Sequence, residues 1–384
     1  MPPAEHAARA DGHSIIVLDS GGGYVRAGFA HAACPEATEP NCTAVVKGQA
    51  GRPPAVGEEA LGLPSCLLLR PTRRGLLLDP EQQRCIWRAL LHKRLALDTR
   101  GCGVVATEAA LAPPSVRREM EDLLFETFGF REVCILPAPP LALQSPGLRK
   151  QLDERNPCCT VLSMGFSGCV AVPCIESRAV SNAVRRLNVG GRVLTNLLIE
   201  RLGLRHFDLS DNWLVAEDIF AKLCEVSPDF DADLRTRFER VERRTYVLPD
   251  FKERTQGFVE ESPAEPDRDA AGKPQAQAQR VTLGAERVVV PEALFRPQDH
   301  GIAQAGVAEL VQRAIFAVGP GHWRPHLGQV ALCGGLARLP GLRERLRREL
   351  RQLLPTDWPV RVLAEQEPEL SVWRGAAQAA LQPS

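Results

Sequence analysis

The chain has 384 residues, of which 44% are hydrophobic and 24% charged, so it is long enough for two or three packed domains of about 150 residues each. The 47 Lys and Arg residues balance the 47 Asp and Glu residues, and this zero net charge argues against nucleic-acid binding driven by overall charge. No segment approaches the ~20 consecutive apolar residues of a membrane span, and the N-terminus lacks the apolar stretch of a secretory signal.

The first part of the chain predicts a strand, a glycine turn and a returning strand. Residues 15–18 are an apolar β-branched run, Gly21, Gly22 and Gly23 predict the turn, and residues 24–30 predict the second strand. Beyond this unit, apolar spacing predicts helices over 80–97 and 115–128 and strands over 104–106 and 133–136. In the second of these helices we expect Ser115 as the N-cap and Gly129 as the stop.

A second unit of the same kind follows, with strands over 160–162 and 169–172 on either side of a turn over 163–168. It repeats the order of the first unit, so the two halves of the chain look like diverged copies of one supersecondary plan. The remaining predictions are helices over 193–202, 214–224, 340–353 and 370–381, and strands over 281–283 and 329–333. In the helix over 340–353, the residues expected to face the core are Leu342, Leu346, Leu350 and Leu353. Residues 260–279 are poor in apolar residues and predict a disordered surface insertion.

The cysteines and histidines predict no metal site. None of the 12 Cys residues forms a Cys-x-x-Cys pair, and the eight His residues are scattered along the chain. Reduced, buried thiols in an intracellular protein are therefore favoured over a disulfide framework.

The glycine turns suggest a binding site for phosphate. A glycine-rich turn between two strands can direct successive backbone N–H groups at one anion, and glycine permits the close approach. Two such hairpins across a cleft would clamp the phosphates of a nucleotide, and Gly334-Gly335 before a helix would allow close contact with a purine. Each turn alone is more often a tight hairpin without a ligand. The pattern is neither a Walker A loop nor a dinucleotide fingerprint.

Taken together in chain order, these segments resemble the actin superfamily. Residues 17–29 resemble the first phosphate hairpin of actin, and the resemblance continues through 104–108, 187–195, 333–335 and 371–375. It implies an α/β, actin-like (ribonuclease H-like) fold with two domains around a central cleft. The domains would span residues 1–143 with 366–384, and residues 144–365. The resemblance also implies a vestigial nucleotide cleft that is formed by Asp19, Gly21, Gly22, Gly23, Arg26, Gly165, Gly191, Gly334 and Gly335.

The departures from the actin pattern carry the functional argument. In actin-type ATPases, one Asp of the first hairpin and two of the second loop organise Mg²⁺ and water around the phosphates. The resemblance keeps Asp19 and aligns Ser163 and Phe166 with the other two positions, so both of these carboxylates are gone. The resemblance also aligns different residues with six further positions: Gly22 replaces a hydroxyl, Ala138 and Val170 a water-positioning Gln and His, Phe220 and Ala221 a Lys and a Glu of the adenosine pocket, and Glu369 another Lys. An apolar ring at Phe166 would oppose a phosphate.

From this pattern we expect a non-catalytic structural subunit with no catalytic residue, no metal site and no required cofactor. Weak ATP binding through backbone N–H groups is the less favoured alternative. Residues 246–251, 290–302 and 355–357 resemble a subfamily of actin-related proteins that belong to nuclear chromatin remodellers of the Swr/SRCAP type, which exchange a variant histone into nucleosomes. The implied partners are the remodeller ATPase and a zinc-finger HIT protein, with nucleosome or DNA contact within the complex.

Two other functions remain open at this point. One is a divergent actin-fold ATPase, and the other is a cytoskeletal actin-like protein that polymerises. The second is less favoured because the chain ends soon after Leu381 and because residues 41–64 look short for actin's inter-subunit loop. We expect a nuclear protein that does not form filaments, with a cytoplasmic pool as the alternative.

Overall fold

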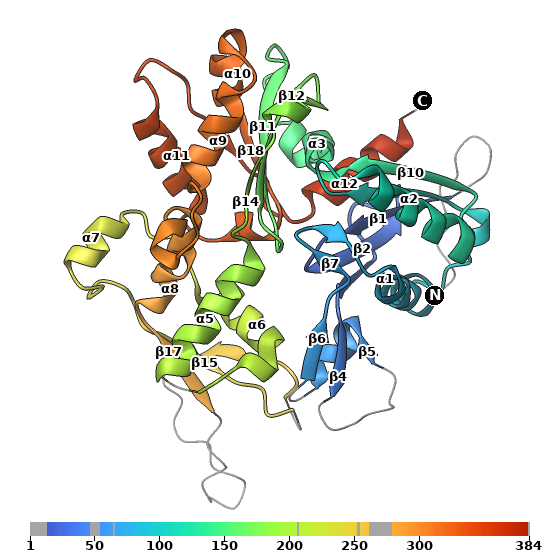
Figure 1. Cartoon of the computed structure of the whole chain (residues 1–384), viewed down its shortest axis with the longest axis horizontal. Coiled ribbons are helices and arrows are strands. Elements are labelled where there is room, and N and C mark those ends of the chain that lie inside the picture. The colour runs from blue at the N-terminus through green and yellow to red at the C-terminus, as the bar shows by residue number, and fades with distance from the viewer. Residues whose placement is uncertain are drawn as a thin grey trace, which may run out of the picture.

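Two large β-sheets, one from each half of the chain, organise the molecule. The computed structural model describes residues 14–46, 54–63, 66–205, 207–251, 254–260 and 279–382. In Figure 1 the N-terminal sheet lies to the right of the second sheet, and the last helix, α12 (Ser371–Leu381), returns to the N-terminal side. Mixed α/β elements around two sheets agree with the predicted fold class.

The two large sheets share one plan. The first has the order β10-β9-β1-β2-β3, formed by Glu132–Pro137, Gly103–Glu108, Ile15–Ser20, Tyr24–Phe29 and Ala37–Pro40. The second has the order β13-β12-β11-β18-β19, formed by Arg178–Ala179, Cys169–Ile175, Cys158–Met164, Val330–Cys333 and Val362–Leu363, with β14 (Arg185–Leu187) paired to β12. In each sheet the first strand of the hairpin pairs antiparallel with the next strand and parallel with a later one, β9 or β18. This symmetry confirms the predicted internal repeat.

Three small sheets complete the β-structure. They are β5-β4-β6 (Ala55–Val56, Thr43–Val46, Cys66–Leu69), β7-β8 (Thr72–Arg73, Leu76–Leu77) and β16-β15-β17 (Phe258–Glu260, Arg244–Val247, Arg280–Leu283). The first two belong to the N-terminal half, and the third lies next to α6 (Trp213–Leu223) in the other half.

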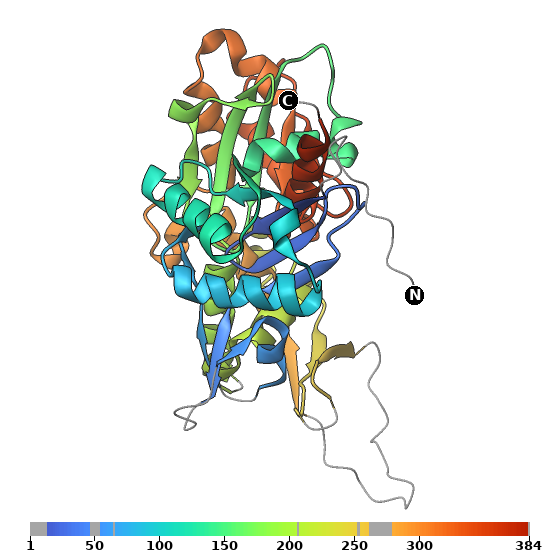
Figure 2. The ribbon, with the colours of Figure 1, turned by 90° about the vertical axis from the view of Figure 1, so that its right-hand side faces the viewer.

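Helices cover both large sheets, which is why their central strands are continuous apolar runs. The five N-terminal residues of β1 are buried on both faces. In Figure 2, α1 (Pro80–Arg88) crosses in front of the first sheet, and it packs there through Ile86 and Trp87. The other α-helices are α2 (Pro114–Asp122), α3 (Ala138–Leu141), α4 (Pro146–Arg149), α5 (Gly191–Arg205), α7 (Phe230–Arg235), α8 (Glu286–Val289), α9 (Val307–Phe316), α10 (Trp323–Leu327) and α11 (Leu342–Leu353).

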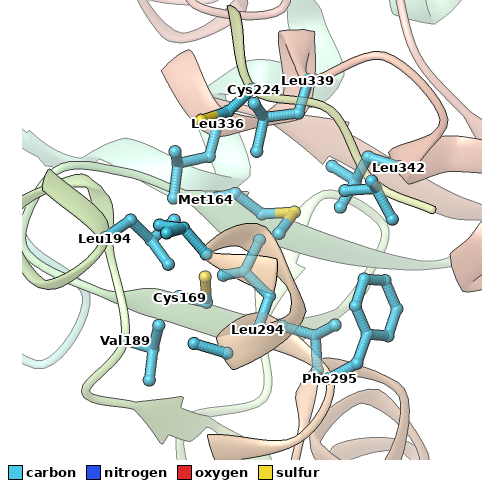
Figure 3. Packing of buried hydrophobic residues seen from close by; sticks show 14 of the residues in the cluster. Met164, Cys169, Val189, Leu194, Cys224, Leu294, Phe295, Leu336, Leu339 and Leu342 are labelled. Carbon is cyan, nitrogen blue, oxygen red and sulfur yellow. The ribbon is translucent and has the colours of Figure 1, made fainter. Parts of the chain in front are cut away.

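The largest apolar core belongs to the second half of the chain. Figure 3 shows part of it, where Met164 of β11 and Cys169 of β12 meet Leu194 of α5 and Leu342 of α11. A separate cluster joins the first sheet to α12 through Val17 and Trp373, and the Trp373 indole donates a hydrogen bond to the Val17 carbonyl at 3.3 Å. The C-terminal helix is therefore fixed to the strand with which the described chain begins.

Helix boundaries and one core position differ from the sequence predictions. Pro113 is the N-cap of α2, and Ser115 lies inside the first turn, because Pro114 has a φ suited to the first helical position. Helix α11 begins at Leu342, since Gly341 before it is left-handed (φ 79°). Leu353 was expected to face the core, but it is 37% exposed because it is the last residue of α11. The stop at Gly129 (φ 66°) is confirmed.

None of the helices in the described ranges is long and apolar enough to cross a membrane. The domain boundaries after residues 143 and 365 stay predictions. Residues 261–278 of the expected insertion lie outside the described residues.

Candidate functional site

The first glycine turn joins β1 to β2 and is held by residues from outside the hairpin. Gly21 N donates to the Tyr24 carbonyl at 2.9 Å, which closes the turn. Asn41 donates through its side chain to the Gly21 carbonyl and through its backbone to the Gly23 carbonyl, both at 2.8 Å. Arg70, which follows β6, donates to the Gly23 carbonyl at 3.1 Å. The carbonyls of the turn are therefore occupied by protein donors.

Asp19, at the end of β1, lies directly behind this turn. Its side chain is buried and accepts a hydrogen bond from the Thr107 hydroxyl at 2.6 Å. Arg26 lies opposite Asp19 in the β1–β2 register, and its guanidinium is 3.7 Å from the carboxylate. The structure thus brings two predicted site residues together as an internal ion pair.

The second glycine turn joins β11 to β12 and is hydrogen-bonded to the start of α5. Gly165 N donates to the Gly168 carbonyl at 3.0 Å, and Gly191 N donates to the Gly165 carbonyl at 3.1 Å. Gly334 has a φ of 94°, and a Cβ there would lie 2.5 Å from the Met164 carbonyl oxygen. Gly335 has open space around it. The glycines at 165, 191 and 334 therefore serve turns and close packing of the second half.

The two glycine turns touch each other. A Cβ on Gly22 would lie 2.2 Å from the Ser167 Oγ atom, and a Cβ on Gly23 would lie 3.0 Å from the Phe166 Cβ atom. Because only glycine leaves room for Phe166 at this distance, the side chain of the second turn occupies the space in front of the first.

Phe166 belongs to a cluster of four residues from distant segments of the sequence: Arg70, Phe166, Trp213 and Glu217. We name it the Arg70 cluster. The Phe166 and Trp213 rings meet edge to face at 5.6 Å, and the Arg70 guanidinium lies 4.2 Å from the Phe166 centroid and 5.0 Å from the Trp213 centroid. Glu217, one turn after Trp213 on α6, is 3.9 Å from Arg70. Arg70 comes from the N-terminal half and the other three residues from the second half, so the cluster bridges the two.

The two charged side chains of the Arg70 cluster are largely buried. Arg70 and Glu217 have side chains only 10% and 18% exposed. Burial raises the pKa of Glu217 to about 7, and the nearby Asp218 adds to this rise while Arg70 opposes it. A cation over two rings in such a desolvated place contributes about 2 kcal/mol.

A small apolar cluster bridges the same two halves. Cys42 and Ala44 from β4 and its entry, with Cys66 of β6, pack against Leu214 of α6. Trp213 also packs against this cluster. The two halves are thus joined by apolar contact as well as through Arg70.

A small cavity lies next to Ser20, the residue before the first turn. Its volume is about 20 Å³, and Ser20, Thr72 and Thr107 are among the residues that line it. That volume holds about one water molecule. The Thr72 hydroxyl is buried without a hydrogen-bond partner, which suits a water at this place.

Comparison with known proteins identifies the family of this chain. A family model described as "Actin" matches residues 10–384. The chain belongs to the actin family. Proteins named "Actin-related protein 6" from Oryza sativa subsp. indica and Arabidopsis thaliana are each 33% identical to it; they match over 97% and 96% of this chain and 93% of their own length. The Drosophila melanogaster protein of that name is 30% identical over 97% of this chain and 94% of its own length. The resemblance to the actin-related proteins is therefore confirmed.

Within the actin family, the positions that lack the expected polar groups here serve packing or surface ion pairs. Phe220 is buried in the core of the second half, and Ala138 and Val170 pack on the core beneath β11. Glu369 pairs with Arg338 at 2.7 Å. Among the described residues, nowhere do three His, Cys, Asp or Glu side chains gather closely enough to hold a metal ion.

The structure thus divides the predicted site residues into two groups. Asp19, Arg26 and the glycines at 21, 22 and 23 belong to the first turn, while those at 165, 191 and 334 belong to the second. What the sequence missed is Arg70, because an Arg between two short strands has no distinguishing pattern. The apolar ring at Phe166 was the only signal that pointed to a filled cleft.

Proposed function

We propose that this chain is a non-catalytic actin-related subunit of a nuclear chromatin-remodelling complex of the Swr/SRCAP type, which exchanges a variant histone into nucleosomes. The observation that carries the non-catalytic part is the position of Phe166, packed against Gly23 and covered by Arg70. In the actin family this is the space between the two phosphate turns. The name shared by the relatives, with the resemblance to the remodeller subfamily, supports the choice of complex.

A subunit with Phe166 packed in this way does not need a bound nucleotide for the proposed role. The Arg70 cluster and the apolar cluster around Cys42 and Leu214 join the two halves directly. A subunit of this kind presents a fixed two-sided surface. We therefore propose a docking role beside the remodeller ATPase and a zinc-finger HIT protein, with nucleosomal DNA nearby in the complex and no filament formed.

The two competing functions make different demands on the cleft. A divergent ATPase needs groups that hold Mg²⁺ and orient water, and Ser163 and Phe166 supply no carboxylate at the two second-loop positions. A filament-forming protein needs the protomer to assemble under salt conditions that polymerise actin. Neither demand applies to a docking subunit.

The test is to identify what co-purifies with the tagged protein from nuclear extract, under salt that removes weak contacts. We expect the remodeller ATPase and the zinc-finger HIT protein in comparable amounts, and less variant histone on chromatin when the gene is deleted. The matched control is tagged actin, which distinguishes general actin-fold binders from specific partners. Recovery of no remodeller subunit, or sedimentation as filaments under actin-polymerising conditions, would contradict the proposal.

A further inference from the structure

A basic hollow lies outside the nucleotide cleft, between the start of α11, the edge strand β19 and the chain after α4. Its volume is about 800 Å³. Four basic side chains line it, against one acidic side chain, Glu344; the basic residues are Lys150, Arg343, Arg347 and Arg361. We name this site the basic pocket. No residue of the glycine turns or of the Arg70 cluster lines it.

Most of the positive charge in the basic pocket is not neutralised by the described part of the protein. Arg347 forms a bidentate pair with Glu344 at 2.7 and 3.1 Å. Arg343 donates to the Val362 carbonyl at 2.8 Å and Arg361 to the Gln151 carbonyl at 3.4 Å, so both are positioned by neutral acceptors. Among the described residues, neither these two nor Lys150 has a carboxylate within 4.0 Å. The pKa of Glu344 is lowered by Arg347 and, to a smaller extent, by Arg343, so this one carboxylate offsets only part of the positive charge of the pocket.

The apolar residues of the pocket are largely covered already. Leu339, Val362 and Leu363 line it but are only 4–8% exposed, and Val360 is half-buried. A ligand in this hollow therefore gains mainly from charge, with a smaller gain from covering Val360. The edge strand β19 contributes little through main-chain pairing, because Arg343 already occupies its Val362 carbonyl.

These features distinguish between two anionic partners. A DNA duplex presents its phosphates as a convex row on a rigid rod, which fits poorly into a hollow of about 800 Å³. An extended acidic peptide is narrow enough to enter a concave site and supplies the negative charge that the basic side chains attract. We propose that the basic pocket binds an acidic peptide segment of a partner protein. This site does not depend on the remodeller assignment, since any partner with such a segment would use it.

The test uses the full purified chain and a defined probe. The probe is a fluorescein-labelled 12-residue peptide in which Asp and Glu alternate with Leu and Val, and its binding is followed by fluorescence anisotropy. We expect saturable binding that weakens as salt is raised, because the contacts are largely ionic. The double variant Arg343→Gln/Arg361→Gln and the single variant Lys150→Gln remove the unpaired cations. We expect about a tenfold or greater loss of affinity for the double variant, and a smaller loss for Lys150→Gln, whose exposed side chain carries little of the fold.

The control variant removes the same charge elsewhere. Arg313→Gln/Arg324→Gln changes two exposed arginines on α9 and α10, and it should bind the probe as the parent does. A second peptide with Lys in place of Asp and Glu should not bind. The proposal is overturned if the parent shows no saturable binding, if both double variants lose affinity equally, or if a DNA duplex displaces the labelled peptide and the same peptide without label does not. These results are independent of which complex the protein joins.

Discussion

ATP hydrolysis by the purified protein should stay at the background rate of the buffer. Each positioned group that orients water or stabilises the transition state contributes about 10²–10⁴ in rate, and the cleft lacks several of these groups at once. Ser163 and Phe166 stand at two of the Mg²⁺ positions, and the one retained carboxylate, Asp19, is bound to Thr107 and Arg26. The measurement is phosphate release from Mg-ATP over hours at high protein concentration.

The control for this prediction is Asp19→Ala. If the parent has no activity, the variant releases phosphate at the same background rate, whereas actin measured beside it turns over. Turnover above background that disappears in Asp19→Ala would show that a working cleft exists. It would also favour the divergent ATPase over the docking subunit.

The largest effect on folding is expected from Gly375→Ala in α12. A Cβ at Gly375 would lie 1.7 Å from the Leu141 carbonyl oxygen and 2.5 Å from its carbon, so the helix must move away from α3. That movement disturbs Trp373, which is fully buried and bonded to Val17. Overpacking of this kind costs about 3 kcal/mol or more. We expect the variant to unfold at a lower urea concentration than the parent. The midpoint of unfolding is measured by tryptophan fluorescence.

Gly203→Ala is the matched control because Gly203 also lies in a helix, α5, and a Cβ added there would have no heavy atom within 4 Å. Alanine is the better helix former at this position, so the variant should be more stable by up to about 1 kcal/mol. Equal midpoints for Gly375→Ala and the parent would mean that α12 is not packed as closely as described.

The sequence was sufficient to predict the central strands of the two large sheets and the repeat because their signal is local, whereas the short strands of the small sheets and sheet edges were mostly missed. β1 is an uninterrupted buried run, and such runs identify strands that are covered on both faces. The helix starts were harder, since Ser115 is a good cap in isolation, yet Pro114 in front of it already fits the first helical position. Leu353 fits the helical spacing but lies where α11 ends at the surface.

The candidate site was predictable in part. The departures at Ser163 and Phe166 could be found by comparison with the actin pattern. An apolar ring at Phe166 implied that phosphate binding in the cleft is unfavourable. The side chains that contact Phe166 could not be predicted, because Arg70 and Trp213 are separated from Phe166 by long stretches of chain. Only the meeting of the two halves brings the guanidinium over the rings. The basic pocket likewise combines Lys150 with the distant Arg343 and Arg361.

We propose that protein side chains, rather than a nucleotide, fill the actin-family cleft of this chain. The most direct measurement is the nucleotide content of the natively purified protein, determined by denaturing it and quantifying the released adenine nucleotides per chain by chromatography. Actin purified in the same buffer is the positive control. We expect a negligible amount per chain, because Phe166 packs against Gly23 and Arg70 covers the Phe166 ring. About one nucleotide released per chain would contradict it.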